Sequence, residues 1–327
     1  MFFISKIDIM NYLDIIIFII VLFVYLHIYY HFKTSSDMEI YTLENLMKER
    51  LEEICNIKQP LKFSYAHNEL NQCNLDFFEK NLNNQGEINI RDTKVDLKET
   101  QYMLPFKTND AIKVLKQDTT SSYISEKNYY FLDEVKMSDN YNNLSSFLKP
   151  PMTVSTKHDF YSGSKNSHTP LRHSIIYRNF YYVSSGKVTI KLIPPKDAFL
   201  LHGHKDYDLF EFSSPINPWN VSKEYVNDFQ NVNHMDIELT EGDILYIPAY
   251  WWYSIRYDEI SSLCVFQYKT FMNVLAITPE LIMYFLQTQN TTHKTEKTID
   301  DILVNTTKNN NETSSKKENT SEKDKKD

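Results

Sequence analysis

Residues 239–257 read LTEGDILYIPAYWWYSIRY, and this stretch decides the fold. The turn signal at 241–243 leads into the β-prone run 244–247, which Pro248 ends because proline cannot donate to a sheet ladder. The aromatic triplet 251–253 and a second β-prone run, 254–257, follow. We predict a β-hairpin of a small antiparallel barrel, with the aromatic residues either closing one end of its core or lining a pocket there.

The composition excludes several classes of protein. A chain of 327 residues holds one large domain with extensions or two domains, and 42% hydrophobic residues allow a sizeable core. The net charge of −8 argues against a nucleic-acid partner. Three widely separated cysteines form neither a zinc signature nor a disulfide framework, which fits a reducing compartment. The bias toward Asn, Ile, Lys and Tyr is typical of an AT-rich genome, such as that of a large DNA virus or a protist.

Residues 12–30, YLDIIIFIIVLFVYLHIYY, follow a short flank at 1–11 and predict an uncleaved single-pass membrane anchor. At 1.5 Å per residue the helix is about 28 Å long, close to the ~30 Å hydrocarbon core of a bilayer. Tyr12, Tyr29 and Tyr30 lie where an aromatic belt is expected. The excess of Lys and Arg after the span favours a cytosolic C-terminal body. A buried core helix is the alternative.

The rest of the chain divides by pattern into three parts. Residues 34–150 mix short helices and strands, beginning with an apolar helical stripe over 37–55. Residues 151–288 read as strands and loops up to about 271, closed by a short apolar helix at 278–288. Residues 289–327 have almost nothing to bury and are expected to be disordered.

A second stretch, 169–195, reads TPLRHSIIYRNFYYVSSGKVTIKLIPP. Residues 177–184 form a strand candidate, the turn contains Gly186, and residues 188–193 alternate with their apolar side chains on one face. This pattern predicts another hairpin with its apolar face inward.

Together the two stretches resemble the paired motifs of JmjC-type cupins, most closely the asparaginyl-hydroxylase-like branch. The family's first motif is Thr-Pro, His-x-Asp, an Asn four residues later, a Gly-x-Lys turn, Leu and Pro-Pro. The second is Gly-Asp-x-Leu-x-Ile-Pro-x-x-Trp-Trp-His. The matching positions are Thr169-Pro170, His173, Asn179, Gly186, Leu192, Pro194-Pro195, Gly242-Asp243, Pro248 and Trp251-Trp252. The resemblance covers about 169–269 and implies a mainly β, double-stranded β-helix (cupin, jelly-roll) core with flanking helices.

Active members of that family hold Fe(II) with two histidines and a carboxylate, leaving positions open for 2-oxoglutarate and dioxygen. Aligned without gaps, only His173 keeps its ligand type. Ile175 stands at the carboxylate, Tyr253 at the second histidine, and Val188 at the lysine that pairs with 2-oxoglutarate. Isoleucine has no lone pair, a phenol has a pKa near 10, and valine cannot pair with a dicarboxylate. We therefore expect a degenerate pocket that also includes Asn179, Trp251 and Trp252, with no catalytic residue and no bound Fe(II) or 2-oxoglutarate.

Two alternatives stay open for this site. One residue more than usual separates Thr-Pro from His173, so the register could slip and place Arg172 at the histidine and Ser174 at the carboxylate. Neither register gives a complete ligand set. His202, His204 and Asp206 could supplement His173, but they follow the Pro-Pro pair, where a surface loop is the simpler interpretation.

The leading hypothesis is a membrane-anchored, non-catalytic binding or scaffold module with an unknown protein partner. The first alternative is an Fe(II)/2-oxoglutarate-dependent protein hydroxylase with an atypical ligand set. The second is a purely structural membrane protein.

Overall fold

The computed structural model describes residues 2–44, 46–65, 67–94 and 103–289, and side chains from residue 12 onward. The chain divides into two compact units. One comprises Met1–Lys205 and Glu211–Ile277, and the other comprises Asp206–Phe210 and Thr278–Asp327. The predicted disordered tail lies outside the described residues, except for its first position.

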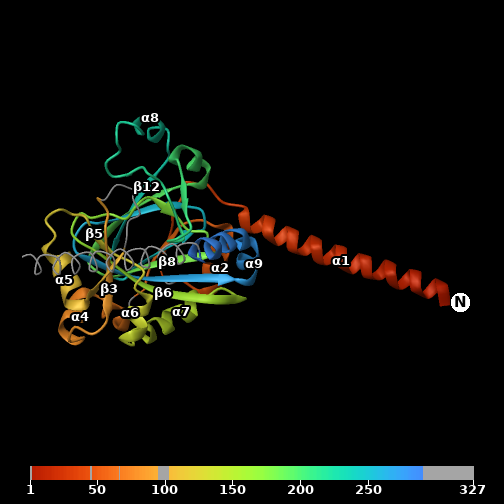
Figure 1. Cartoon of the computed structure of the whole chain (residues 1–327), viewed down its shortest axis with the longest axis horizontal. Helices are drawn as coiled ribbons and strands as arrows, with labels where there is room; N and C mark the ends of the chain where they lie inside the picture. The colour runs from red at the N-terminus through yellow and green to blue at the C-terminus, as the bar shows by residue number, and fades with distance from the viewer. Residues whose placement is uncertain (1, 45, 66, 95–102, 290–327) are drawn as a thin grey trace, which may run out of the picture. The chain divides into compact units, whose positions relative to one another are not determined.

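Two β-sheets form the body of the larger unit, which confirms the mainly β class (Figure 1). The nine-stranded sheet has the order β1 (Tyr41–Leu43), β2 (Leu61–Ser64), β13 (Asp243–Pro248), β8 (Arg178–Ser185), β15 (Ser261–Thr270), β6 (Thr153–Gly163), β5 (Tyr123–Ser125), β3 (Glu87–Asp92) and β4 (Leu104–Lys107). The six-stranded sheet has the order β10 (His204–Asp206), β11 (Glu211–Ser213), β7 (Arg172–His173), β14 (Trp252–Tyr257), β9 (Lys187–Ile193) and β12 (Met235–Thr240).

An inner core joins the two sheets. Tyr181 and Val183 on β8 belong to the same buried cluster as Val188 on β9 and Tyr253 on β14. Because successive strand residues point to opposite faces, Phe180 and Tyr182 belong instead to the cluster on the other side of β8. The central strands of the nine-stranded sheet, β8, β13 and most of β15, are therefore buried on both faces.

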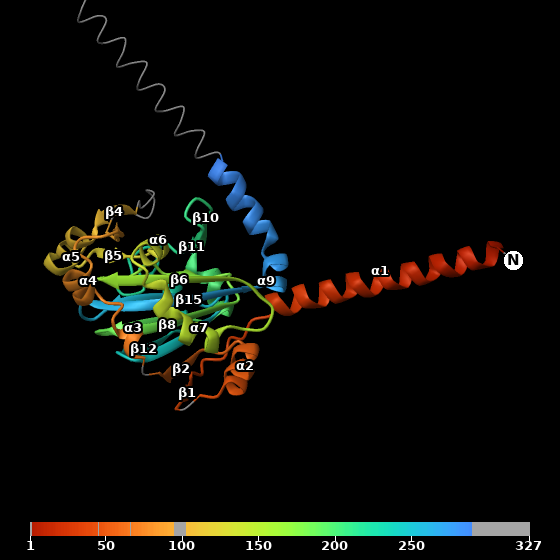
Figure 2. The same cartoon turned by 90° about the horizontal axis from the view of Figure 1, so that it is seen from below.

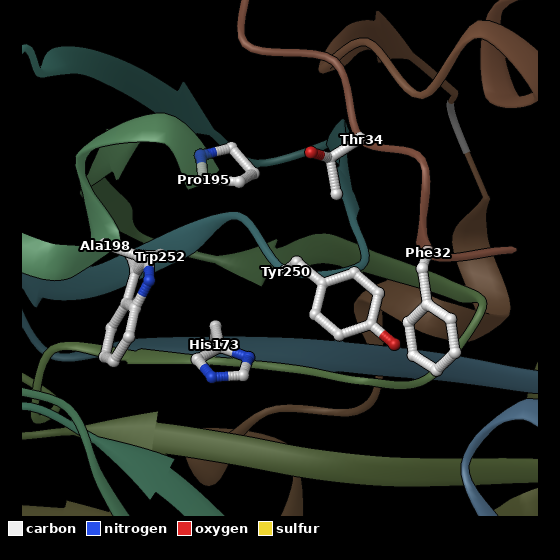
Figure 3. Close-up of a pocket in the computed structure, with 7 residues that line it drawn as sticks. All are labelled: Phe32, Thr34, His173, Pro195, Ala198, Tyr250 and Trp252. Carbon is white, nitrogen blue, oxygen red and sulfur yellow. The ribbon is translucent and has the colours of Figure 1, made fainter. Parts of the chain in front are cut away.

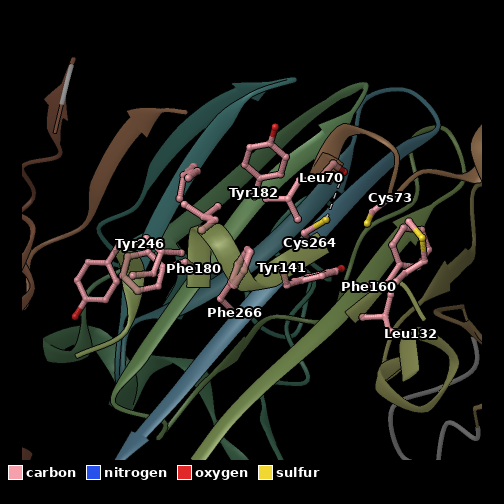
Figure 4. Close-up of a cluster of buried hydrophobic side chains, with 14 of the residues drawn as sticks. Leu70, Cys73, Leu132, Tyr141, Phe160, Phe180, Tyr182, Tyr246, Cys264 and Phe266 are labelled. Atoms are coloured by element: carbon pink, nitrogen blue, oxygen red, sulfur yellow. Dashed lines mark hydrogen bonds between the residues drawn. The ribbon is translucent and has the colours of Figure 1, made fainter. Parts of the chain in front are cut away.

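Helices cover the outer face of the nine-stranded sheet (Figures 2 and 4). Their apolar sides join the outer side chains of β8, β13, β15 and β6 in one cluster, which also contains the free thiols of Cys73 and Cys264. The helices that contribute are α2 (Lys48–Ile57), α3 (Asn68–Asn71), α4 (Leu75–Asn81), α5 (Thr108–Gln117), α6 (Tyr129–Glu134), η1 (Ser138–Tyr141) and α7 (Asn142–Leu148).

Both predicted hairpins are wrong in their pairing, although their strands exist. β8 pairs with β13 and β15, whereas β9 pairs with β12 and β14. The turn at Gly186 (φ 81°) therefore carries the chain from one sheet to the other. The connection from β13 to β14 does the same. Burial of one face of each strand against the opposite sheet outweighs local pairing here.

The predicted helix over 37–55 is shorter than expected. Residues 41–43 form β1, which pairs in parallel with β2, and α2 begins only at Lys48. The mixture of short helices and strands expected over 34–150 is present, with α4, α5 and α6 among its helices. In the smaller unit, residues 278–289 are helical, as predicted for 278–288.

The N-terminal helix α1 runs from Phe2 to Phe32 and contains an apolar stretch, Tyr12–Phe32, long enough to cross a membrane. An 18-residue apolar portion of this stretch contains no buried residue, which does not match a core helix buried within this chain. The C-terminal end of α1 contacts α9 (Phe271–Ala276), as both views show (Figures 1 and 2).

A buried carboxyl gives the larger unit a predicted pH dependence. The Asp159 side chain accepts hydrogen bonds from the main-chain N–H groups of Asn128 (2.6 Å) and Phe160 (2.8 Å), but its burial raises its pKa from 3.8 to about 6. Between these values the unfolded chain binds fewer protons, so the Asp159 contribution to stability falls as the pH rises from about 4 to 6.

Asp159→Asn keeps an acceptor oxygen and removes this titration. We expect the stability of the variant relative to the wild type to rise by up to about 3 kcal/mol between pH 4 and pH 7. Urea denaturation at several pH values measures this difference, and a flat difference would contradict the prediction.

Candidate functional site

The pairing of β7 with β14 determines which side chains face the inner core. Arg172 lies opposite Tyr253, and His173 lies opposite Trp252. Directly opposed residues of antiparallel strands share a face, and neighbours along a strand face opposite ways. Tyr253 belongs to the inner cluster and Trp252 to an outer one. Arg172 therefore faces inward, and His173 faces outward.

The inner end of β14 is filled by aromatic and aliphatic side chains. The hydroxyl of Tyr181 donates a 2.7 Å hydrogen bond to the hydroxyl of Tyr253. The Arg172 guanidinium lies 5.6 Å from the centre of the Tyr253 ring. Val188 is fully buried in the same cluster. Tyr253 and Val188, which stand at the predicted positions of the second histidine and of the lysine, are thus part of a packed core.

Four charged side chains form a buried network beside this core. Arg172 makes two hydrogen bonds to Glu126, one of them 2.8 Å long, and Arg91 makes three to Glu211, of 2.9–3.2 Å. Arg91 also lies 3.6 Å from Glu126, and Arg172 lies 3.7 Å from Glu211. None of the four side chains is more than 7% exposed. The network connects β3 and the end of β5 in one sheet to β7 and β11 in the other.

The charges in this network satisfy one another. Burial alone would raise the pKa of Glu211, but Arg172 and Arg91 outweigh it and hold that pKa at about 2. Both carboxylates therefore accept hydrogen bonds from guanidinium groups that always carry charge. Oxygen lone pairs engaged in this way are not available to a metal ion.

The other residues of the first motif that were expected near the iron site are Ser174, Ile175 and Asn179, and they too have other partners. The Ser174 hydroxyl donates a 3.0 Å hydrogen bond to the side-chain oxygen of Asn179, and Asn179 donates to the carbonyl of Ile176. Ile175 is buried, and its carbonyl accepts a 3.1 Å hydrogen bond from Asn273. The structure does not bring His173 and Tyr253 into one pocket. Arg172 faces the inner core beside Tyr253, which is the orientation that a one-residue slip predicts for Arg172.

The tryptophan pair is separated by the same alternation. Trp251 is fully buried in the inner cluster, and its indole nitrogen has no hydrogen-bond partner in the described part of the chain. Trp252 packs on the outer face with Leu171 and Ile193. One prediction, that aromatic residues close the core, holds for Trp251, whereas the other, that they line a pocket, holds for Trp252.

The additional ligand candidates lie on the surface. His202 follows η2 (Pro195–Leu201) in a left-handed conformation, and its ring is hydrogen-bonded to the Asp228 carboxyl at 2.7 Å, with both side chains nearly half exposed. His204 is exposed. Within the smaller unit, Asp206 accepts hydrogen bonds from the main chain of Asp208 and Leu209. Among the described residues, no group of three or more His, Cys, Asp or Glu side chains is arranged to hold a metal ion.

A pocket of about 290 Å³ lies on the outer face of β7, where the His173 side chain points into it (Figure 3). Its lining consists of Phe32, Thr34, His173, Pro195, Ala198, Tyr250 and Trp252. The His173 ring lies 4.6 Å from the Trp252 ring and 5.3 Å from the Phe212 ring. The sequence patterns did not predict this pocket, because its walls come from four separate segments. The extra residue before His173 was the only signal that this side chain faces outward.

The environment keeps the imidazole of His173 neutral. Burial, with a smaller contribution from Lys205, lowers its pKa to about 4. Its Nδ1 atom is buried and forms no hydrogen bond of good geometry within the described chain. The nearby main chain of Ser174 acts in the opposite direction and raises the pKa of His173 slightly. A neutral imidazole offers one donor and one acceptor, so the pocket contains an uncharged polar group among apolar walls.

Comparison with known proteins identifies a family that covers most of the chain and relatives that cover part of it. Residues 43–274 match the family described as "Cupin-like domain". The chain is 31% identical over 94 residues to JmjC domain-containing protein D of Dictyostelium discoideum, covering 29% of this chain and 21% of that protein. It is 28% identical over 95 residues to HSPB1-associated protein 1 of Rattus norvegicus, covering 29% of this chain and 20% of that protein. The alignments thus span about a fifth of the length of these curated relatives.

Proposed function

This chain belongs to the family of cupin-like domains, and on that premise we propose that it is a non-catalytic binding module held at a membrane by its N-terminal helix. The observation that carries the proposal is the ionic network of Arg91, Glu126, Arg172 and Glu211 beside the filled inner core. It occupies the end of the domain where the family resemblance predicts an iron site.

We take the two sheets as a double-stranded β-helix and compare this end with the ligand set implied by the resemblance. The residues do not fit Fe(II). Arg172, a cation, faces the core opposite Tyr253, whose phenol oxygen accepts the hydrogen bond from Tyr181. Ser174 is hydrogen-bonded to Asn179 and offers no carboxylate. Val188 offers no charge to a dicarboxylate such as 2-oxoglutarate.

The membrane tether is supported by the length and exposure of the apolar segment Tyr12–Phe32. In water, 21 residues of this composition would expose a continuous apolar surface, which a bilayer would bury. The Lys and Arg residues that follow the span support a cytosolic location for the domain. A protein partner is supported by the name of one relative, HSPB1-associated protein 1, which describes that protein as associated with HSPB1.

Metal and cosubstrate binding by the full chain in detergent tests the loss of catalysis. We expect titration calorimetry to detect no saturable binding of Mn(II), used in place of Fe(II), and no binding of 2-oxoglutarate. We also expect no succinate from 2-oxoglutarate when Fe(II) is supplied. His173→Ala should behave like the wild type in all three measurements, because His173 faces the outer pocket.

A different result would favour the hydroxylase alternative. One-to-one Mn(II) binding that is lost in His173→Ala, or in the double variant His202→Ala/His204→Ala, would overturn the proposal and identify the atypical ligand set. An active cupin hydroxylase measured in the same buffers confirms that the assays detect binding and turnover.

A further inference from the structure

We propose that the outer pocket binds the ester end of a bilayer lipid, with acyl carbons against Phe32 and Trp252 and an ester carbonyl accepting a hydrogen bond from His173. This inference rests on the proposed membrane tether. It assigns a ligand to a pocket on the opposite face of β7 and β14 from the inner core.

The first support is the position of the pocket at the end of the apolar segment. Phe32 is the last residue of Tyr12–Phe32 and also a wall of the pocket, and Thr34 is two residues further along. Figure 3 shows Phe32 and Tyr250 at one side of the cavity and Trp252 and Ala198 at the other, with His173 between them. If α1 crosses a bilayer, this cavity lies at the level of the headgroups and esters.

The second support is that the end of α1 is firmly attached to the domain. The Lys58 ammonium donates hydrogen bonds to the carbonyls of Tyr30 (2.8 Å), His31 (2.6 Å) and Lys33. Tyr30 and His31 belong to the last turn of the helix and Lys33 directly follows it, where carbonyls lack partners and a cation is favourable. The His31 ring is hydrogen-bonded to Asn273 (3.1 Å) and Tyr250 (3.4 Å). The pocket therefore keeps a constant position relative to the span.

The third support is the chemistry of the lining. Its seven residues include no charged side chain, which does not suit a phosphate or a carboxylate. Its polar side-chain groups are the neutral imidazole of His173, the hydroxyls of Thr34 and Tyr250, and the indole N–H of Trp252. A volume of about 290 Å³ is at the lower end of the roughly 300–1,000 Å³ of small-molecule pockets. It suits part of a lipid, such as an ester with a few chain carbons.

The surface next to the pocket is also suited to a membrane. Phe199, the neighbour of the lining residue Ala198 on η2, is 78% exposed, and Tyr30 and Phe32 are each 49% exposed. Large aromatic side chains are favoured at the boundary between water and lipid. These aromatic side chains offer a lipid chain apolar surface near the pocket.

Photolabelling of the full chain in vesicles tests this inference. The probe is a phosphatidylcholine with a diazirine early in one acyl chain, and cross-linked peptides are identified by mass spectrometry. For the wild type we expect labels both along 12–32 and on the pocket segments around residues 173, 195–198 and 250–252. Ala198→Trp fills the cavity and should reduce the pocket labels at least tenfold while leaving the labels on 12–32 unchanged.

Two further variants make the test specific. Phe199→Trp introduces the same side chain at the adjacent, outward-facing position and should leave the pocket labels intact. His173→Phe keeps an aromatic ring but removes the donor, and should reduce them several-fold. Circular dichroism confirms that each variant is folded.

The outcomes separate this inference from the tether. Labels on 12–32 without labels in the wild-type pocket would overturn lipid binding and leave the tether intact. Pocket labels that persist in Ala198→Trp would also overturn it. An absence of labels on 12–32 would overturn the tether itself, and the lipid site with it.

Discussion

Arg172→Met is expected to lower the free energy of unfolding by about 3–5 kcal/mol, because it leaves the fully buried carboxylate of Glu126 without the guanidinium that makes two hydrogen bonds to it. Arg91, 3.6 Å away, compensates only in part because it already pairs with Glu211. Urea denaturation of the full chain in detergent, followed by tryptophan fluorescence, measures the loss.

Two controls connect this loss to burial. Arg50→Met removes an exposed guanidinium that lies 2.7 Å from Glu53 and should cost less than about 1 kcal/mol. The double variant Arg172→Met/Glu126→Leu replaces both charges with apolar side chains and should recover most of the stability. A loss below about 1 kcal/mol for Arg172→Met alone would mean that the network is not buried as described.

Trp251→Ala is expected to cost about 3–5 kcal/mol, because it opens a cavity in the inner core between the two sheets. Trp251 follows the proline corner at the end of β13 and immediately precedes β14. Its side chain is fully buried among residues of both sheets. Thermal unfolding followed by circular dichroism detects the change without relying on the deleted fluorophore.

Trp251→Phe is the matched variant. It keeps most of the ring and removes an indole N–H that has no hydrogen-bond partner in the described part of the chain, so the cost should be below about 1.5 kcal/mol. Similar losses in the two variants would show that the indole nitrogen has a partner essential to the fold. A loss below about 1 kcal/mol in Trp251→Ala would place this side chain outside the core.

Strand positions in the family-matching region were predictable from residue type alone. Alternation along 188–193 and the β-prone runs 244–247 and 254–257 correspond to β9, β13 and β14. Strand partners were not predictable in the same way. A short turn such as that at Gly186 joins two strands of one sheet in a hairpin, but it also allows the chain to cross between sheets, and only burial against the second sheet decides which occurs.

The candidate site shows the same limit at the level of single side chains. The sequence motifs indicated that the iron ligands are incomplete in either register. They could not decide whether His173 or Arg172 faces the inner core, because a shift of one residue exchanges the two faces of a strand. The pairing of His173 with Trp252 decided it. The partners of Arg172 could not be predicted either, since Glu126 and Glu211 lie 46 and 39 residues away along the chain.

By itself the sequence determined the family, the mainly β class and the apolar N-terminal helix, because these depend on residue type and local spacing. Only the tertiary structure decided which strands share a sheet, which side of β7 faces the core, and that the end of α1 contributes to a pocket with His173. Those features depend on contacts between residues far apart in the chain, and their energy comes from burial and charge pairing that no local pattern records.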